Sequence, residues 1–131
     1  MTRVLLVGAN GQVGTELQRS LAGLGELTCA TRDGRLADGA ACEVADLAQP
    51  GTLAGLVARL QPDIVVNAAA HTAVDRAETE RALAFRINAE TPAALAEACR
   101  AHEAQQLHYS TDYDFDGRGD RPYREGDPVA P

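Results

Sequence analysis

The chain has 131 residues, of which 45% are hydrophobic and 24% are charged, and its formal net charge at pH 7 is -7. A chain of this size buries a real core, so we expect residues 1–131 to form one domain. The acidic balance argues against nucleic acid or an anionic membrane as a partner. Because no apolar run is long enough for a signal sequence or a membrane span, we expect a soluble, cytoplasmic protein.

The three cysteines, Cys29, Cys42 and Cys99, are odd in number and widely spaced. They are embedded among alanine, threonine and valine, which is typical of buried free thiols rather than of a disulfide framework or a metal site. We therefore expect reduced thiols and a reducing compartment.

The N-terminal part of the chain predicts a strand, a helix and two further strands. Residues 3–7 (RVLLV) form an unbroken apolar run before a glycine, which indicates a strand buried on both faces. Apolar residues then recur at helical spacing over residues 13–24, up to Gly25, and predict one helix. Residues 27–31 predict the second strand, and residues 41–44 predict a weaker third strand.

The middle of the chain predicts further helices between two strands. In residues 51–60, leucine and valine recur at helical spacing until a proline ends the helix. The runs DIVVN (63–67) and QLHYS (106–110) predict the fourth and fifth strands. Between them, the alanine-rich residues 72–102 predict two helices that meet near residues 88–92, since a proline fits the first turn of a helix.

Residues 111–131 are polar, contain several glycines and prolines, and predict a loop. In the rest of the chain, strands alternate with helices through short connections, which implies right-handed crossovers. The predicted fold class is therefore α/β, a doubly wound parallel sheet of the Rossmann, NAD(P)-binding type. Its expected strand order is 3-2-1-4-5.

Three glycines lie between the first strand and the first helix, where a Rossmann fold places its phosphate-binding turn. Gly8 permits the tight turn, Gly11 lets the backbone approach a pyrophosphate, and Gly14 lets the helix pack on the strand. An isolated pattern of this kind favours a plain turn. A strand before it and a helix after it favour a dinucleotide site.

Two other segments end at the same edge of the predicted sheet, where ligands of this fold bind. Asp46 and Leu47 follow the third strand, so the carboxylate can accept from an adenine amino group, or it can cap the helix that begins near Pro50. Residues 67–70 end the fourth strand with small side chains. They leave room for a ribose and a nicotinamide, or they simply pack the sheet against a helix.

The residues after the second strand bear on the choice of nucleotide. An NAD-specific site usually has an acidic residue there, which bonds the ribose hydroxyls. This chain has Thr31, Arg32 and Asp33. Arg32 favours a 2′-phosphate and hence NADPH, unless it is a solvated loop residue, while Asp33 keeps NADH open.

Thr111 follows the fifth strand and is the best catalytic candidate in the chain. Its hydroxyl can donate to a substrate carbonyl that becomes an alkoxide as hydride arrives. The alternative is a turn in which Thr111 or Asp112 bonds its own backbone.

Four stretches together resemble the dTDP-4-dehydrorhamnose reductases of the extended short-chain dehydrogenase superfamily: GANGQVGTEL, VVNAAAHTAVDRAE, INAETPAALA and HYSTDYDFDGRGDRPYREGDPVAP. The resemblance covers essentially the whole chain. It implies NADPH- or NADH-dependent reduction of the 4-keto group of dTDP-4-dehydro-L-rhamnose to dTDP-L-rhamnose, a step of dTDP-rhamnose and cell-surface polysaccharide biosynthesis.

The resemblance also implies roles for individual residues. It assigns the cofactor diphosphate to Gly11, Gln12 and Val13, the adenine to Asp46 and Leu47, and the ribose side to Ala68, Ala69 and Ala70. Thr111 matches the catalytic hydroxyl, and Thr111 with Asp112 matches the sugar-nucleotide contact. Some family members hold Mg²⁺ through carboxylates at a homodimer contact, and Glu16 matches one of these.

The family places a YGxxK motif, with a catalytic tyrosine and lysine, shortly after a stretch like EGDPVAP. This chain reaches Pro131 before such a motif and contains no lysine. We therefore expect the N-terminal portion of a reductase, truncated after the fifth strand, that by itself binds cofactor weakly and turns over negligibly. The alternatives are a non-catalytic NADP-binding regulatory subunit resembling this reductase, or another extended short-chain epimerase or dehydratase acting on a sugar nucleotide.

Overall fold

The computed structural model describes all residues from 1 to 131, and its strands form one five-stranded sheet with the order β3-β2-β1-β4-β5. The strands are β1 (Arg3–Val7), β2 (Glu26–Thr31), β3 (Glu43–Val44), β4 (Ile64–Asn67) and β5 (Gln105–His108). Every neighbouring pair runs parallel. The predicted doubly wound sheet and its strand order are therefore confirmed.

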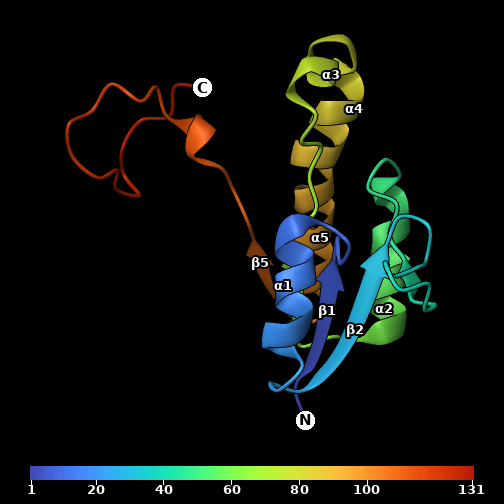
Figure 1. Cartoon of the computed structure of the whole chain (residues 1–131). Coiled ribbons are helices and arrows are strands. Elements are labelled where there is room, and N and C mark those ends of the chain that lie inside the picture. The colour runs from blue at the N-terminus through green and yellow to red at the C-terminus, as the bar shows by residue number, and fades with distance from the viewer.

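Helices connect the strands and cover both faces of the sheet (Figure 1). They are α1 (Gln12–Leu21), α2 (Leu53–Leu60), α3 (Val74–Thr79), α4 (Arg81–Phe85) and α5 (Thr91–Ala101), with 3-10 helices η1 (Pro50–Thr52) and η3 (Asp112–Asp114) and a π-helical segment η2 (Arg86–Glu90). None of these helices combines the length and apolarity that a membrane crossing requires.

The core lies on both faces of β1, which explains why this strand is apolar from Val4 to Val7. Leu5 and Val7 point into the larger cluster, which α2 and α5 complete with residues such as Leu53 and Leu95. Val4 and Leu6 point to the opposite face, where α1 covers a smaller cluster. Successive side chains of a strand alternate between faces, so only a strand covered on both faces needs an unbroken apolar run.

The first helix is shorter than predicted, since α1 ends at Leu21. Leu24, expected on its apolar stripe, is 67% exposed, and Val13 is 43% exposed. The chain must turn here to enter β2: the Leu24 N–H donates to the Leu21 carbonyl, and the Glu26 N–H donates to the Thr2 carbonyl. The helix therefore ends where the backbone forms the hydrogen bonds of this turn, and not where the apolar spacing stops.

The helical stretch after β4 is interrupted earlier than predicted. The break falls at Glu80, whose φ of -107° and ψ of 43° separate α3 from α4. Around residues 88–92, by contrast, α4, η2 and α5 follow one another without a gap. Pro92 lacks the N–H that would bond the carbonyl one turn earlier, and the wider π segment directly before α5 accommodates this loss.

The tail after β5 contains only η3 and is otherwise loop, as predicted. It extends away from the sheet and folds back on itself (Figure 1). The rings of Phe115 and Tyr123 stack with their centroids 4.2 Å apart, and Arg121 pairs with Asp127 at 2.9 Å. Contacts within the tail therefore define its path.

Candidate functional site

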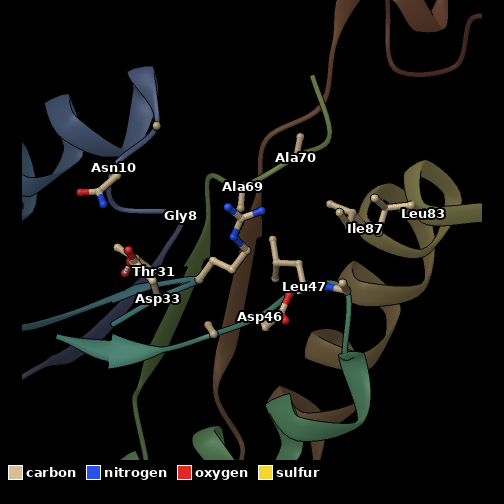
Figure 2. Close-up of a pocket in the computed structure, with 14 residues that line it drawn as sticks. Gly8, Asn10, Thr31, Asp33, Asp46, Leu47, Ala69, Ala70, Leu83 and Ile87 are labelled. Carbon is tan, nitrogen blue, oxygen red and sulfur yellow. Dashed lines mark hydrogen bonds between the residues drawn. The ribbon is translucent and has the colours of Figure 1, made fainter. Parts of the chain in front are cut away.

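A cavity of about 610 Å³ lies beyond the carboxyl ends of β1 to β4, within the usual size range of small-molecule sites. Backbone turns after these strands form most of its wall, and the α4–η2 helix forms the far side (Figure 2). Its lining residues are Gly8, Asn10, Gly11, Thr31, Arg32, Asp33, Ala45, Asp46, Leu47, Ala48, Ala69, Ala70, Leu83 and Ile87.

The glycine turn packs tightly between β1, α1 and β4. Gly8 has a φ of +82°, and a Cβ at this position would lie only 2.6 Å from the Ala69 Cβ. A Cβ on Gly14 would clash with the carbonyl oxygen of Gly8. These two glycines therefore allow the close approach of backbone segments, and only Gly8 also requires left-handed backbone.

Gly11 has a different surrounding, although it belongs to the same turn. It is the N-cap of α1, with no side-chain cap and no acidic residue in the first turn. A Cβ here would lie no closer than 3.5 Å to any protein atom, which is an ordinary contact. Gly11 itself lines the cavity, and a helix end without a side-chain cap favours a bound anion, because its first N–H groups have no partner within the helix.

The loop after β2 holds Asp33 in place through its own hydrogen bonds. The buried Thr31 hydroxyl lies 3.1 Å from Asp33 Oδ1 and accepts from the Arg35 N–H at 3.0 Å. The Arg35 N–H also donates to Asp33 Oδ1, and this bond, followed by that from Thr31, lowers the pKa of Asp33. Arg32 is exposed and takes part in none of the salt bridges of the chain.

Asp46 lines the cavity and does not cap a helix. Its Oδ1 accepts from the Ala48 N–H at 3.0 Å, whereas the N-cap of η1 is Gln49, without a side-chain bond. The alternative of a helix cap at Asp46 is therefore wrong. The neighbouring Leu47 carbonyl accepts from the Thr91 hydroxyl at 2.7 Å, which ties this wall of the cavity to α5.

The turn after β4 is held by the buried side chain of Asn67, whose Oδ1 accepts from the Ala69 N–H at 3.2 Å. Ala69 and Ala70 line the cavity, as the expected ribose side requires. Ala68 does not, because it packs on the opposite face of the sheet with the α1 cluster.

Five lining residues had no individual signal in the sequence: Asn10, Ala45, Ala48, Leu83 and Ile87. Leu83 and Ile87 lie four positions apart on α4 and η2, across the cavity from Asn10 (Figure 2). Their spacing is that of an ordinary core-facing helix stripe, so it indicates burial and not a ligand. Asn10 lies within the glycine turn, where its Nδ2 donates to the Arg35 carbonyl at 2.8 Å and so joins two walls of the cavity.

Several predicted site residues lie elsewhere. Gln12, Val13 and Gly14 do not line the cavity, and neither do Thr111 and Asp112. The Thr111 hydroxyl accepts from the Tyr113 N–H at 3.2 Å, which is the turn that the sequence left as an alternative. Its catalytic role stays a prediction.

Glu16 is exposed on α1 and pairs with Arg19. The chain contains no cluster of three or more histidine, cysteine or carboxylate side chains placed to hold a metal ion. Magnesium at Glu16 also stays a prediction.

Comparison with known proteins extends these observations. The family model described as RmlD substrate binding domain matches residues 1–131. A dTDP-4-dehydrorhamnose reductase of Burkholderia thailandensis is 48% identical over 129 residues, which cover 98% of this chain and 40% of that protein. The chain thus spans about 40% of the length of the curated relatives it matches.

Two solved structures share the fold closely. A dTDP-4-dehydrorhamnose reductase of Clostridium acetobutylicum superposes with a TM-score of 0.85 at 36% identity, covering 99% of this chain and 43% of that chain. One from Bacillus anthracis, solved in complex with NADP, superposes with a TM-score of 0.86 at 32% identity, covering 100% of this chain and 44% of that chain.

Proposed function

This chain belongs to the RmlD substrate binding domain family, and from that membership we propose that it is the cofactor-binding portion of an NADPH-dependent reductase. The substrate we propose is dTDP-4-dehydro-L-rhamnose, reduced at its 4-keto group to dTDP-L-rhamnose. The observation that carries the proposal is the cavity of about 610 Å³ in which the glycine turn and the uncapped N-terminus of α1 meet the ends of four parallel strands.

The residues present fit the diphosphate of a dinucleotide. A diphosphate needs several N–H donors and a backbone it can approach closely. The first turn of α1 supplies the donors, and no acidic side chain in this turn opposes the negative charge. The open space where Gly11 lacks a Cβ provides the close approach. In our proposal, Gln12 and Val13 contribute backbone N–H groups and Gly14 contributes packing.

The loop after β2 favours NADPH over NADH. Binding of the ribose hydroxyls of NADH needs a carboxylate free to accept from both of them, but Asp33 Oδ1 already accepts from Thr31 and from the Arg35 N–H, which leaves Oδ2 alone for a ligand. Arg32 lines the same wall without a salt-bridge partner. A guanidinium in this position suits a 2′-phosphate, because it offers several donors and a permanent charge.

The remaining walls suit the other parts of the cofactor. We assign the adenine to the region of Asp46 and Leu47, where Ile87 adds an apolar surface from the opposite helix. The small side chains of Ala69 and Ala70 leave room for the ribose next to the nicotinamide. NADPH bound in this way would supply the hydride for the reduction.

Thr111 is our proposed donor to the substrate carbonyl, with Asp112 beside it as a sugar-nucleotide contact. Thr111 is exposed shortly after β5, and β5 is the neighbour of β4 in the sheet. Since its oxygen accepts from the Tyr113 N–H, the hydroxyl hydrogen is directed away from that bond, and its contact with Asp112 Oδ1 is long at 3.5 Å. A hydrogen held this loosely is free to donate to a carbonyl oxygen that gains negative charge.

A nucleotide titration of the chain tests the proposal. We expect NADPH to bind more tightly than NADH. Arg32→Ala should weaken NADPH binding by about tenfold to a hundredfold, the effect of losing a charge-assisted contact, and leave NADH binding unchanged. Isothermal calorimetry with both nucleotides measures these values directly.

Arg118→Ala is the matched control, because it removes the same charge from the exposed tail. It should bind both nucleotides as the unaltered chain does. Equal losses for NADPH and NADH in Arg32→Ala would contradict the assignment of the 2′-phosphate. Failure of the unaltered chain to bind either nucleotide would overturn the proposed function.

A further inference from the structure

Two cysteines lie next to each other behind the loop that carries Arg32. Cys29 belongs to β2, and Cys42 directly precedes β3. Both are half-buried and line one shallow pocket on the outer part of the sheet. The sequence predicted buried free thiols, but only Cys99 is buried in the core.

The strand register brings the two cysteines near each other. Ala30 pairs with Glu43 and Thr31 with Val44, and Cys29 and Cys42 are the residues directly before the first of these pairs on the two neighbouring chain segments. Neighbouring strands lie about 4.7–4.9 Å apart, and disulfides join residues whose Cα atoms are about 4.4–6.8 Å apart. The backbone separation is therefore compatible with a disulfide.

The side chains also share one face of the sheet. Thr31 comes two positions after Cys29 in the same strand, so the two side chains point the same way. The Thr31 hydroxyl lies 3.4 Å from the Cys42 sulfur. Both thiols thus lie on the face that carries Thr31.

Cys42 supports the loop that forms one wall of the cofactor cavity. Its N–H donates to the Gly34 carbonyl at 2.9 Å, and its sulfur contacts Thr31. The same Thr31 hydroxyl bonds Asp33 and the Arg35 N–H, on both sides of the segment next to Arg32. A displacement of the Cys42 sulfur therefore acts directly on this loop.

We propose that Cys29 and Cys42 form a cross-strand dithiol that a low-molecular-weight disulfide oxidises to an intramolecular disulfide, and that this oxidation weakens binding of the cofactor. The second half of the proposal rests on the proposed function. The first half concerns the thiols alone.

The reaction proceeds by two thiol–disulfide exchanges. Burial, and then the nearby Cys42, raise the pKa of Cys29, which makes Cys29 the poorer attacking thiol, so we assign the first attack to Cys42. The Cys42 thiolate attacks one sulfur of the small disulfide and releases the other as a thiolate. Cys29 then loses its proton to solvent and attacks the Cys42 sulfur, which releases a second small thiol. Two protein thiols are oxidised, and one small disulfide is reduced to two thiols.

Oxidation moves the Cys42 sulfur toward Cys29 and away from Thr31. The loop then loses one of the contacts that hold Thr31, and the backbone next to Arg32 is held less firmly. We expect NADPH to bind up to about tenfold more weakly, comparable to the loss of one ordinary hydrogen bond. By linkage, saturating NADPH should lower the equilibrium constant for disulfide formation by the same factor.

Peptide mapping of the chain, equilibrated with oxidised and reduced glutathione, tests the first half. Reduced chain should react with an alkylating agent at all three free cysteines after denaturation. Oxidised chain should react only at Cys99, and its digest should contain a peptide that links Cys29 to Cys42. Three reactive thiols under oxidising conditions, or a link between two chains, would overturn the dithiol.

Serine variants provide the controls. Cys99→Ser should form the disulfide as the unaltered chain does, whereas Cys29→Ser and Cys42→Ser should stop at a mixed disulfide with glutathione. The mapping of the unaltered chain does not depend on these variants, so it decides the question even if one of them fails to fold.

NADPH titration of the reduced and the oxidised chain tests the second half. A lower affinity of the oxidised chain supports it, and equal affinities overturn it. If neither form binds NADPH, the proposed function and the cofactor effect both fail, while the mapping still decides whether the disulfide forms.

Discussion

Replacing Gly8 with alanine, and comparing the result with Gly11→Ala, tests whether Gly8 is required for packing and Gly11 for ligand binding. The added Cβ of Gly8→Ala would meet three atoms of Ala69 at 2.6–2.8 Å, two of which belong to the backbone and cannot rotate away. The backbone at this position also has a φ of +82°, which disfavours any residue with a Cβ. Both effects destabilise the folded chain.

The strained backbone and the steric overlap destabilise the folded chain by similar amounts. Left-handed backbone costs roughly 1–2 kcal/mol for a residue with a Cβ, and overpacking a close contact costs roughly 1–3 kcal/mol. Together they lower the free energy of unfolding by about 2–5 kcal/mol. An unfolding entropy of about 2.1 cal/mol/K per residue then predicts that Tm falls by about 7–18 °C in a chain of 131 residues.

Gly11→Ala is the matched substitution in the same turn. Gly11 has an ordinary φ of -69°, and its added Cβ meets no atom closer than 3.5 Å. We expect its free energy of unfolding to change by less than about 1 kcal/mol, the usual range for an N-cap exchange of this kind. Its NADPH affinity should nevertheless fall, because the methyl group occupies the space proposed for the diphosphate.

Thermal unfolding followed by circular dichroism, together with a nucleotide titration, separates the two cases. Equal Tm values for Gly8→Ala and Gly11→Ala would refute the steric reasoning about β1, α1 and β4. Unchanged NADPH affinity in Gly11→Ala would refute the place assigned to the diphosphate.

Two further predictions concern the core and the response to pH. Leu95→Ala should lower the free energy of unfolding by about 2–5 kcal/mol in a urea titration, because Leu95 is fully buried in the larger cluster. As a control, Leu24→Ala should change the free energy of unfolding by less than about 0.5 kcal/mol, because the Leu24 side chain is 67% exposed. The Arg3 N–H, which donates to Asp63 at 2.7 Å, and then the Arg3 charge hold the pKa of Asp63 below its ordinary value. This contribution to stability is complete above the unfolded-state pKa of about 3.9 and disappears as pH falls through the lower folded-state pKa, so Asp63→Asn should lose less Tm than the unaltered chain on acidification. An identical acid response of the two proteins would contradict this.

Much of the fold could be predicted because its central strands are continuous apolar runs, which indicate strands buried on both faces of a sheet. The run at β1 and the spacing of the helices around it suffice to derive the sheet order, since parallel connections allow few alternatives. Helix ends were less predictable. Leu24 continues the apolar spacing of α1 but lies in the turn to β2, and nothing in the local sequence marks Glu80 as the break between α3 and α4. Both depend on contacts with segments that are distant in sequence.

The residues of the candidate site also divide into those that the sequence predicted and those that it did not. Gly8, Gly11, Arg32, Asp46, Leu47, Ala69 and Ala70 all line the cavity, because each lies within a few residues after a strand whose carboxyl end faces the same edge of the sheet. Leu83 and Ile87 could not be assigned, since an apolar helix stripe looks the same whether it faces a core or a ligand. Position after a strand is thus informative where residue type alone is not.

The wall at Leu83 and Ile87 also bears on how folding and binding are connected. A few hydrogen bonds join the walls of the cavity directly, among them those of Asn10 to Arg35, Arg86 to Ala48 and Thr91 to Leu47, while the sheet beneath connects the rest. A molecule that filled the space would contact the turns after four strands and one helix at the same time. It would thereby link segments that are far apart in the sequence. Occupancy would then oppose unfolding of the whole assembly of strands rather than of one loop, since a ligand that binds only the native form shifts the entire equilibrium toward it.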